Sequence, residues 1–374
     1  MTSERMRTRA HQSDVLQIHG SCFGTVPQGV QFAALRENAI IADMTQPIRI
    51  GILGTARIAR TVVPHMIASE HTEVVAVASR TMDKARQFAN DFGIETAYEA
   101  YDTLLSAADV DAVYIPLPPS MHCEWTVRAA SAGMHVLCEK PLAINSSQAQ
   151  QMIDAAIRHQ IVLLDAVMWY HTARAAAMRD IVLNGQLGDV RQVTSAFTFP
   201  GHVLAEDNLR FSASLGGGSL LDIGWYCVGM SLWMLQRLPE RVFATAQWRN
   251  GIDFRMNGLL WFPENQMASF ESGFDAVRRR WMEIAGTDAA VVCDDFTKPW
   301  NADNPRFWIH KADGTSVEKV VPHPPIERCL VDAFCQLIRS GNTEHDWLTL
   351  SLQTQQVCDA LLRSAQSGVV ESLQ

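Results

Sequence analysis

The sequence lacks several features that would each assign the chain to a specialised class. No hydrophobic run approaches the roughly 18–20 apolar residues that a membrane-spanning helix needs. The eight cysteines form no C-x-x-C pair and have no histidine at zinc-ligand spacing, so neither a disulfide framework nor a metal site is predicted. The formal net charge is −9 with scattered basic residues, which argues against nucleic acid or an anionic membrane as a partner. We expect a reduced, cytoplasmic protein.

The length predicts more than one domain. A chain of 374 residues is long for a single hydrophobic core. Residues 1–43 are polar and irregular, and we expect a disordered or irregular N-terminal extension, with Met44 close to the natural start. From 44 to 168, short apolar runs alternate with helical patterns, which is typical of a parallel α/β sheet. From 169 to 374, strand-like segments follow one another with few helices, which predicts an α+β domain with an antiparallel sheet.

The hydrophobic periodicity locates the elements of both domains. Strands of the first domain are expected at 48–53, 73–79, 95–98, 111–115, 135–138 and 161–165, and helices at 57–68, 83–91, 101–106, 121–132 and 146–159. Strands of the second are expected at 190–199, 241–249, 255–262, 266–274, 278–285, 289–293 and 305–310. Helices accompany them at 173–184, 220–235, 325–340 and 347–367, and the last two could pack back on the first domain. Asp83, Ser146 and Ser219 are the expected N-caps.

The most informative segment is 216–226, Gly-Gly-Gly-Ser-Leu-Leu-Asp-Ile-Gly-Trp-Tyr. Three glycines allow the loop to pass close to a ligand and to adopt positive φ. Asp222 and Tyr226 follow four residues apart, so they share one face of the expected helix. The pattern indicates either an acid–base site facing a cleft or a helix start with a buried tyrosine.

A second segment favours the acid–base interpretation. Glu139-Lys140-Pro141 follows the apolar strand at 135–138. Proline cannot continue a central strand, so the strand must end there and Lys140 must lie at its carboxyl end. In open α/β sheets ligands bind at that edge. Lys140 is therefore a candidate ligand-facing cation rather than a solvated surface lysine.

The turn after the first strand is a candidate dinucleotide site. Residues 51–59 place Gly54 at the first position of G-x-G-x-x-G, with alanine at the second and third. The expected cofactor contacts of this turn are Gly54, Thr55, Ala56, Arg57 and Ile58. An ordinary strand–helix turn is the alternative.

The end of the second strand indicates which nicotinamide cofactor is used. An NAD site has an acidic residue there for the ribose 2′-hydroxyl. This chain has Ser79 and Arg80, with Lys84 one turn further. A hydroxyl and cations suit a 2′-phosphate, because guanidinium binds phosphate through charge-assisted hydrogen bonds. The sequence favours NADP and leaves NAD possible; Arg80 could instead stack on the adenine.

Together these segments resemble a known family. Residues 51–59, 139–141 and 216–226 resemble the glucose–fructose oxidoreductase/inositol dehydrogenase (Gfo/Idh/MocA) family, and 284–288 resembles its second-domain strand signature. The resemblance extends over about 48–365. Tyr226, where other branches carry histidine, is similar to the branch of xylose and dihydrodiol dehydrogenases.

The resemblance implies a fold and an activity. The fold would be an N-terminal Rossmann domain with a parallel sheet and a C-terminal α+β domain with an open, mostly antiparallel sheet. That open sheet often forms the subunit interface in the family, which implies a homodimer or homotetramer. The activity would be NAD(P)-dependent hydride transfer at a sugar, polyol or vicinal-diol carbon.

The resemblance also implies roles for individual residues. Lys140 and Tyr226 would be the catalytic pair with Asp222 supporting them, and the peptide before Pro141 would be cis. Pro119 stands where the family usually carries an asparagine near the nicotinamide. Further cofactor contacts would be Pro116, Leu117, His122, Glu139, Lys140 and Trp169. Substrate-side candidates are Asn208, Arg210, His171 and Arg174, each of which could equally be structural, together with Tyr226.

The expected mechanism joins Lys140 to Tyr226. A tyrosine has a reference pKa near 10, which is too high for a base at neutral pH. A nearby lysine ammonium is expected to lower the pKa of Tyr226, which would then transfer the proton. Which of the two side chains is the formal acid–base stays open at this point.

Two other functions are compatible with the same fold. One is a regulatory protein that binds NADP or a sugar without catalysis, although the presence of both Lys140 and Tyr226 argues against it. The other is an aldose–aldose oxidoreductase that keeps its NADP tightly bound. A metal-dependent dehydrogenase is not expected, because Lys140 already supplies the positive charge that a metal would bring.

Overall fold

The computed structural model describes residues 46–107 and 109–373, which lie in one compact unit. The expected extension at 1–43 lies outside these residues. Within the described ranges, no helix combines the length and the apolar character that crossing a bilayer requires.

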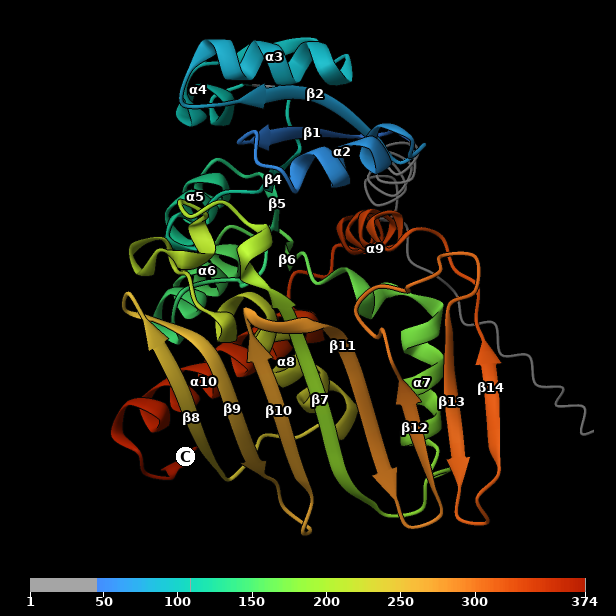
Figure 1. Cartoon of the computed structure of the whole chain (residues 1–374). Coiled ribbons are helices and arrows are strands. Elements are labelled where there is room, and N and C mark those ends of the chain that lie inside the picture. The colour runs from blue at the N-terminus through green and yellow to red at the C-terminus, as the bar shows by residue number, and fades with distance from the viewer. Residues whose placement is uncertain (1–45, 108, 374) are drawn as a thin grey trace, which may run out of the picture. The chain divides into compact units, whose positions relative to one another are not determined.

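A six-stranded parallel sheet forms the first domain (Figure 1). Its strands are β1 (Ile48–Leu53), β2 (Thr72–Ala78), β3 (Thr96–Tyr98), β4 (Ala112–Ile115), β5 (His135–Cys138) and β6 (Leu163–Asp165). The order β3-β2-β1-β4-β5-β6 is that of a dinucleotide-binding Rossmann fold. The order reverses between β1 and β4, so the ligand crevice is expected outside their carboxyl ends.

The helices of this domain start one or two residues away from two of the expected caps. They are α2 (Ala59–Ile67), α3 (Met82–Phe92), α4 (Tyr101–Leu105), α5 (Pro119–Ser131) and α6 (Ser146–Arg158). The N-cap of α3 is Thr81, so Asp83 lies inside the first turn. The N-cap of α6 is Asn145, whose side chain accepts a hydrogen bond from the amide of Gln148 at 2.9 Å. Asp83 and Ser146 as caps were therefore wrong, because the residue with the extended backbone that a cap requires is Thr81 for α3 and Asn145 for α6.

The second domain is built on a nine-stranded sheet of order β14-β13-β12-β11-β7-β10-β9-β8-β15. Its strands are β7 (Val190–Pro200), β8 (Arg241–Arg249), β9 (Ile252–Trp261), β10 (Met267–Gly273), β11 (Asp275–Gly286), β12 (Ala289–Cys293), β13 (Arg306–Lys311), β14 (Ser316–Val320) and β15 (Glu371–Ser372). The sheet is antiparallel except that β10 runs parallel to β7. The sequence analysis did not predict β14, because this exposed edge strand carries too few apolar residues to show a pattern.

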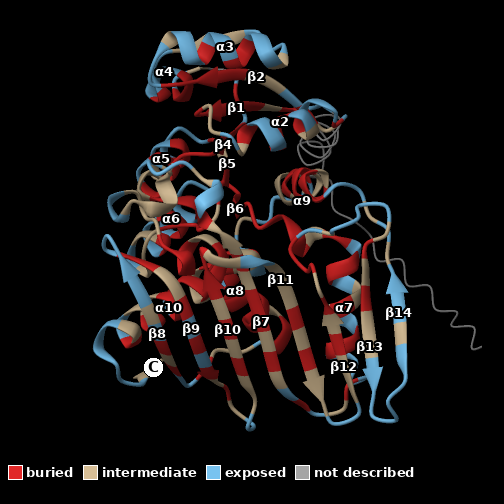
Figure 2. Cartoon of the chain, in the orientation of Figure 1, coloured by how far each residue is buried: buried red, intermediate tan, exposed pale blue. Residues whose placement is uncertain are grey.

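In the described part of the chain, helices cover one face of this sheet and leave the other bare. The helices are α7 (Ala173–Leu183), α8 (Trp225–Leu235), α9 (Ile326–Ser340) and α10 (Asp346–Ser367), and α8 and α10 pack on the sheet. The opposite face carries none of the helices that the structure describes, as Figure 1 shows, and Figure 2 shows buried positions recurring along the central strands. The apolar side of α9, with Leu330 and Phe334, packs instead into the core of the first domain against Val62 and Met66 of α2.

The start of the helix that carries Tyr226 differs from the expectation. Residues Leu220–Gly224 form a π-helical turn before α8, and Ser219 makes no capping hydrogen bond. Ser219 instead donates from Oγ to Asp253 Oδ2 at 2.9 Å, and the same oxygen accepts the amide of Leu220 at 2.6 Å. The helix start is therefore capped from strand β9. Burial raises the pKa of this Asp253 carboxyl to about 6.

Candidate active site

Lys140 is hydrogen-bonded to the glycine-rich segment of the second domain. It follows β5, and the Lys140–Pro141 peptide is cis, as expected. Its Nζ donates to Asp222 Oδ1 at 2.9 Å and to the carbonyl oxygen of Asp222 at 2.5 Å. The two side chains are only 13% and 12% exposed, so this ion pair joins the two domains in a largely water-excluded place.

Arg210 holds the other side of the same carboxylate. Its Nε donates to Asp222 Oδ2 at 2.6 Å, and its Nη1 lies 3.4 Å from Asn208 Oδ1. Burial alone would raise the pKa of Asp222, but the charges of Lys140 and Arg210 outweigh it and the pKa is lowered. Asp222 is therefore a carboxylate bridging two cations. Arg210, a third exposed, still reaches solvent.

Tyr226 lies beside this network, and the shift of its pKa is opposite to the one that the sequence analysis expected. Lys140 Nζ lies 5.2 Å from the centroid of the Tyr226 ring, over its face. Burial raises the pKa of Tyr226, the carboxylates of Glu139 and Asp222 raise it further, and Arg210 opposes them. The expectation that Lys140 lowers this pKa was wrong, because the ammonium is directed at Asp222. The raised pKa favours the protonated phenol of Tyr226 at neutral pH.

The glycines of this segment make room for the chain itself. A Cβ on Gly217 would lie 2.5 Å from the carbonyl oxygen of Arg210, and Gly218 has φ +122°. The amide of Gly218 donates to that same carbonyl at 3.0 Å. A Cβ on Gly216 would lie 2.9 Å from Pro119, the first residue of α5. The glycines thus allow the loop to hold Arg210 and to dock on the first domain.

The turn after β1 fits a pyrophosphate. Gly54 has φ +116°, and a Cβ there would lie 2.9 Å from Leu117 Cδ2. Within the described ranges, the backbone amides of Thr55, Ala56 and Arg57 have no hydrogen-bond partner. They precede the first turn of α2, together with Ile58, which makes no side-chain cap. Unpartnered amides at a helix N-terminus are suited to bind phosphate oxygens.

The residues after β2 are placed to hold a further phosphate. Ser79 is buried, whereas Arg80 and Lys84 are exposed at the start of α3. Neither cation forms an ion pair with any other residue that the structure describes. Thr81 begins α3 without a side-chain capping bond. Cationic side chains and a helix N-terminus are thus available after β2, where a dinucleotide-binding fold is expected to hold the ribose.

Four other candidates for cofactor contact are buried behind that edge. Pro116 and Leu117 follow β4, and both residues are buried. Leu117 packs on Gly54. Glu139 is 6% exposed and accepts a hydrogen bond from Tyr114 Oη at 2.6 Å. His122 is fully buried. Glu139 and His122 thus support the edge from within rather than facing a ligand.

The residues after β6 lie in the core of the second domain. Trp169 is 1% exposed and packs edge-on against Trp233 and Phe296. The His171 ring lies 4.8 Å from the Trp347 ring, and burial lowers the pKa of His171 to about 4. The structure does not bring either side chain to Lys140.

Arg174 is also remote from the ammonium of Lys140. Its guanidinium donates to Asp295 Oδ1 at 2.5 Å, and the two side chains are 2% and 6% exposed. Arg174 was wrong as a substrate contact, because its guanidinium is buried and donates to Asp295 and to the backbone carbonyls of Asp295, Phe296 and Arg306.

Sequence reasoning missed Asp253, which caps the Tyr226 helix. The signal was a single carboxylate inside the apolar run Ile252-Asp253-Phe254 at the start of a strand. It also missed Asp295, the partner of Arg174, which follows a strand end without any periodic pattern.

Comparison with known proteins assigns both domains to one family. The model for an oxidoreductase family with an NAD-binding Rossmann fold (GFO_IDH_MocA) matches residues 48–165. The GFO/IDH/MocA C-terminal domain model matches residues 175–292. The two matches together span both sides of the Lys140–Asp222 contact.

Individual relatives share most of the chain. A dTDP-3,4-didehydro-2,6-dideoxy-alpha-D-glucose 3-reductase from Streptomyces violaceoruber is 36% identical, over 81% of this chain and 88% of the relative. D-xylose 1-dehydrogenase (NADP(+)) 2 from Haloferax volcanii is 34% identical, over 86% and 99%. The crystal structure of KijD10, a 3-ketoreductase from Actinomadura kijaniata in complex with NADP and TDP-benzene, superposes with a TM-score of 0.80 at 31% identity, over 85% and 98%. The chain therefore belongs to the GFO/IDH/MocA family of oxidoreductases.

Proposed function

We propose that the protein transfers a hydride between NADP and a carbon of a sugar, polyol or vicinal diol. The observation that carries this proposal is the Lys140–Asp222–Arg210 network with Tyr226 beside it, at the carboxyl edge of a Rossmann sheet. The nicotinamide, when bound, supplies or accepts the hydride. The protein has to bind and orient the substrate and to move a proton at the oxygen on the same carbon.

The network divides this work between two side chains. An ammonium has three N–H groups, and that of Lys140 donates to the side-chain Oδ1 and to the backbone carbonyl oxygen of Asp222. A donor of Lys140 remains for the substrate oxygen, which it orients and polarises. Tyr226 is protonated at rest, so during reduction it donates its proton to that oxygen and is left as a phenolate that regains a proton from solvent. During oxidation it has to lose its own proton before it accepts that of the substrate hydroxyl. We therefore assign Tyr226 as the acid–base residue and Lys140 as the electrostatic partner.

The cofactor assignment rests on the cations after β2. Arg80 and Lys84 suit a 2′-phosphate, and the relatives include a xylose dehydrogenase named for NADP(+) and a ketoreductase complex with NADP. Arg80→Ala should weaken NADP⁺ binding by about 10- to 100-fold, the value of a charge-assisted hydrogen bond, and change NAD⁺ binding little. Thermal-shift titration of both nucleotides measures this. Arg86→Ala, an exposed arginine on the same helix, is the matched control.

The same titration separates the proposal from its alternatives. Wild type that shifts with NADP⁺ and then turns over a panel of aldoses, ketoses and diols at 340 nm supports the proposal. Purified protein that already absorbs near 340 nm and does not shift indicates tightly bound cofactor, as in an aldose–aldose oxidoreductase. Binding of NADP⁺ with no turnover in either direction indicates a regulatory protein and contradicts the proposal.

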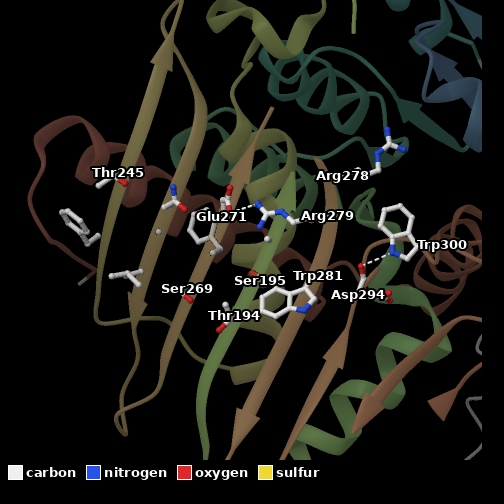
Figure 3. Close-up of a pocket in the computed structure, with 16 residues that line it drawn as sticks. Thr194, Ser195, Thr245, Ser269, Glu271, Arg278, Arg279, Trp281, Asp294 and Trp300 are labelled. Carbon is white, nitrogen blue, oxygen red and sulfur yellow. Dashed lines mark hydrogen bonds and ion pairs between the residues drawn. The ribbon is translucent and has the colours of Figure 1, made fainter. Parts of the chain in front are cut away.

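We also propose that a second copy of the chain covers the bare face of the sheet. A hollow of about 840 Å³ lies on this face (Figure 3). Its walls include Trp281, the 49% exposed Trp300, the 36% exposed Leu259 and the Arg279–Glu271 ion pair of 2.6 Å. A broad face of mixed apolar and charged side chains is typical of a subunit interface.

A glutamate in this face should dissociate the proposed dimer. Leu259→Glu places a charge within the proposed interface, where its desolvation would weaken association by about tenfold or more. Light scattering coupled to size exclusion, over a range of protein concentrations, measures the mass. Ile67→Glu, at a 45% exposed position of α2, is the control and should leave the mass unchanged. A wild-type chain that is monomeric at all concentrations contradicts this interface.

The cysteines support a cytoplasmic location as part of the proposal. Seven cysteines in the described part of the chain are free thiols, and all of them are buried. A reducing compartment suits such a set.

A further inference from the structure

His122 contacts two loops that meet at the proposed catalytic edge. It lies in the first turns of α5 and is fully buried. Its Nε2 is 2.8 Å from the carbonyl oxygen of Leu117, and its Nδ1 is 2.9 Å from the carbonyl oxygen of Pro141. Leu117 packs on Gly54 of the nucleotide turn, and Pro141 directly follows Lys140. One imidazole ring thus touches the backbone of both loops.

The chemistry of these two contacts depends on protonation. Carbonyl oxygens only accept hydrogen bonds, whereas a neutral imidazole has one N–H and one lone pair. A neutral His122 could therefore satisfy one carbonyl and would face the other with a lone pair. An imidazolium donates from both nitrogens and satisfies both. His135 in β5 shows the opposite arrangement, because its Nδ1 accepts the amide of Val162 at 2.9 Å.

We propose that His122 is a positioning residue that joins the Leu117 loop to the Lys140–Pro141 loop, and that it joins them fully only as an imidazolium donating from both ring nitrogens. The ring itself is out of reach of any ligand, so it acts through the two loops. The inference rests on the proposed function, because that function makes these loops the walls of the nicotinamide site.

The surroundings of the ring set the pH range. Burial lowers the pKa of His122 below its usual value, the carbonyls of Leu117, Pro141 and Leu142 oppose this, and the Lys140 ammonium adds to the lowering. The other nearby charge, Glu139, is turned toward Tyr114, and the α5 residues Glu124 and Arg128 pair with each other at the surface. His122 therefore takes up its second proton below neutral pH, and the second hydrogen bond forms when it does.

A thermodynamic consequence follows for the cofactor. If NADPH binds best when both loops are held, its affinity rises as the pH falls through the pKa of His122. By reciprocity, NADPH must raise the pKa of His122 by the same factor. A histidine that only fills space would show neither effect.

The first test follows the ring nitrogens of His122 in the full chain by ¹⁵N NMR with labelled histidine, with and without NADPH. We expect both nitrogens of His122 to be protonated at acid pH, with the transition moved to higher pH by NADPH. His135 should keep an unprotonated Nδ1 where His122 has none. A His122 that stays a neutral tautomer between pH 5.5 and pH 8, with and without nucleotide, overturns the proposal.

The second test measures the Kd of NADPH at pH 7.5 and pH 5.5. The amide of His122→Asn replaces the donor at Nδ1, and that of His122→Gln replaces the donor at Nε2, so each variant keeps one of the two bonds. Between pH 7.5 and pH 5.5, the affinity of wild type for NADPH should rise by about fivefold or more relative to the affinities of both variants. The nucleotide phosphates titrate in the same way with wild type and with both variants, so their effect on the Kd cancels in this comparison.

The control variant is Cys123→Ala, a neighbour on α5 whose thiol faces Gln148 and Gln151 of α6 instead of the loops. It should follow wild type at both pH values. The same pH dependence in wild type and both His122 variants overturns the proposal while leaving the proposed function intact. Absence of NADPH binding at either pH contradicts the proposed function itself.

Discussion

Replacing Lys140 by methionine should lower kcat by about 10²- to 10⁴-fold, the range for loss of a group that assists proton transfer. Methionine keeps most of the length of the side chain but has no donor for the substrate oxygen. Asp222 would keep Arg210 as its partner, so the fold around the site should persist. The measurement is kcat and KM for NADPH-dependent turnover of the best substrate found for wild type.

The control for this prediction is Lys319→Met in the exposed edge strand β14, which should leave kcat and KM unchanged. Thermal unfolding of Lys140→Met within a few degrees of wild type would show that the loss is chemical. A variant with near-native kcat/KM would remove Lys140 from the mechanism and leave Tyr226 to act alone.

The elements that the sequence predicted are those with a periodic signal. Buried parallel strands such as β4 and β5 read as short apolar runs, and α9 reads as an amphipathic helix. The exposed edge strand β14 has no such signal. The parallel pairing of β10 with β7 depends on a crossover through α8, which local sequence does not encode.

The site could be predicted as far as its residues follow strand ends. Lys140 and Asp222 meet because one follows β5 and the other lies in the glycine-rich segment, as the motifs indicated. The ionisation of Tyr226 could not be predicted, because it depends on burial and on the charge of Glu139, which comes near it only in the folded chain. The capping of that helix by Asp253, 31 positions after Asp222, is likewise a tertiary contact.

Arg174 illustrates how a charged residue after a strand end can mislead. The sequence analysis placed it among the substrate candidates, because it follows β6 as Lys140 follows β5. In the structure its guanidinium donates to the carboxylate of Asp295 and to three backbone carbonyls, with 2% of the side chain exposed. A role in stability and a role in substrate binding make opposite predictions for its removal.

Arg174→Met should lower the free energy of unfolding by about 3–5 kcal/mol, because it leaves the Asp295 carboxylate buried without its cation. KM and kcat should stay within about twofold of wild type in the folded variant. Chemical denaturation measures the first quantity and steady-state kinetics below the transition measures the second. Arg191→Met breaks an exposed ion pair with Asp189 and should cost no more than about 1 kcal/mol.

The double variant Arg174→Met/Asp295→Leu tests whether the loss of stability comes from the unpaired carboxylate of Asp295. Removing both charges eliminates the uncompensated carboxylate, so the double variant should be more stable than Arg174→Met alone, although the amide of Trp300 then loses its acceptor on Asp295. A double variant less stable than either single one would mean that Asp295 is held mainly by its backbone donors. An Arg174→Met protein of normal stability with a raised KM would instead return Arg174 to the substrate site and contradict the structural assignment.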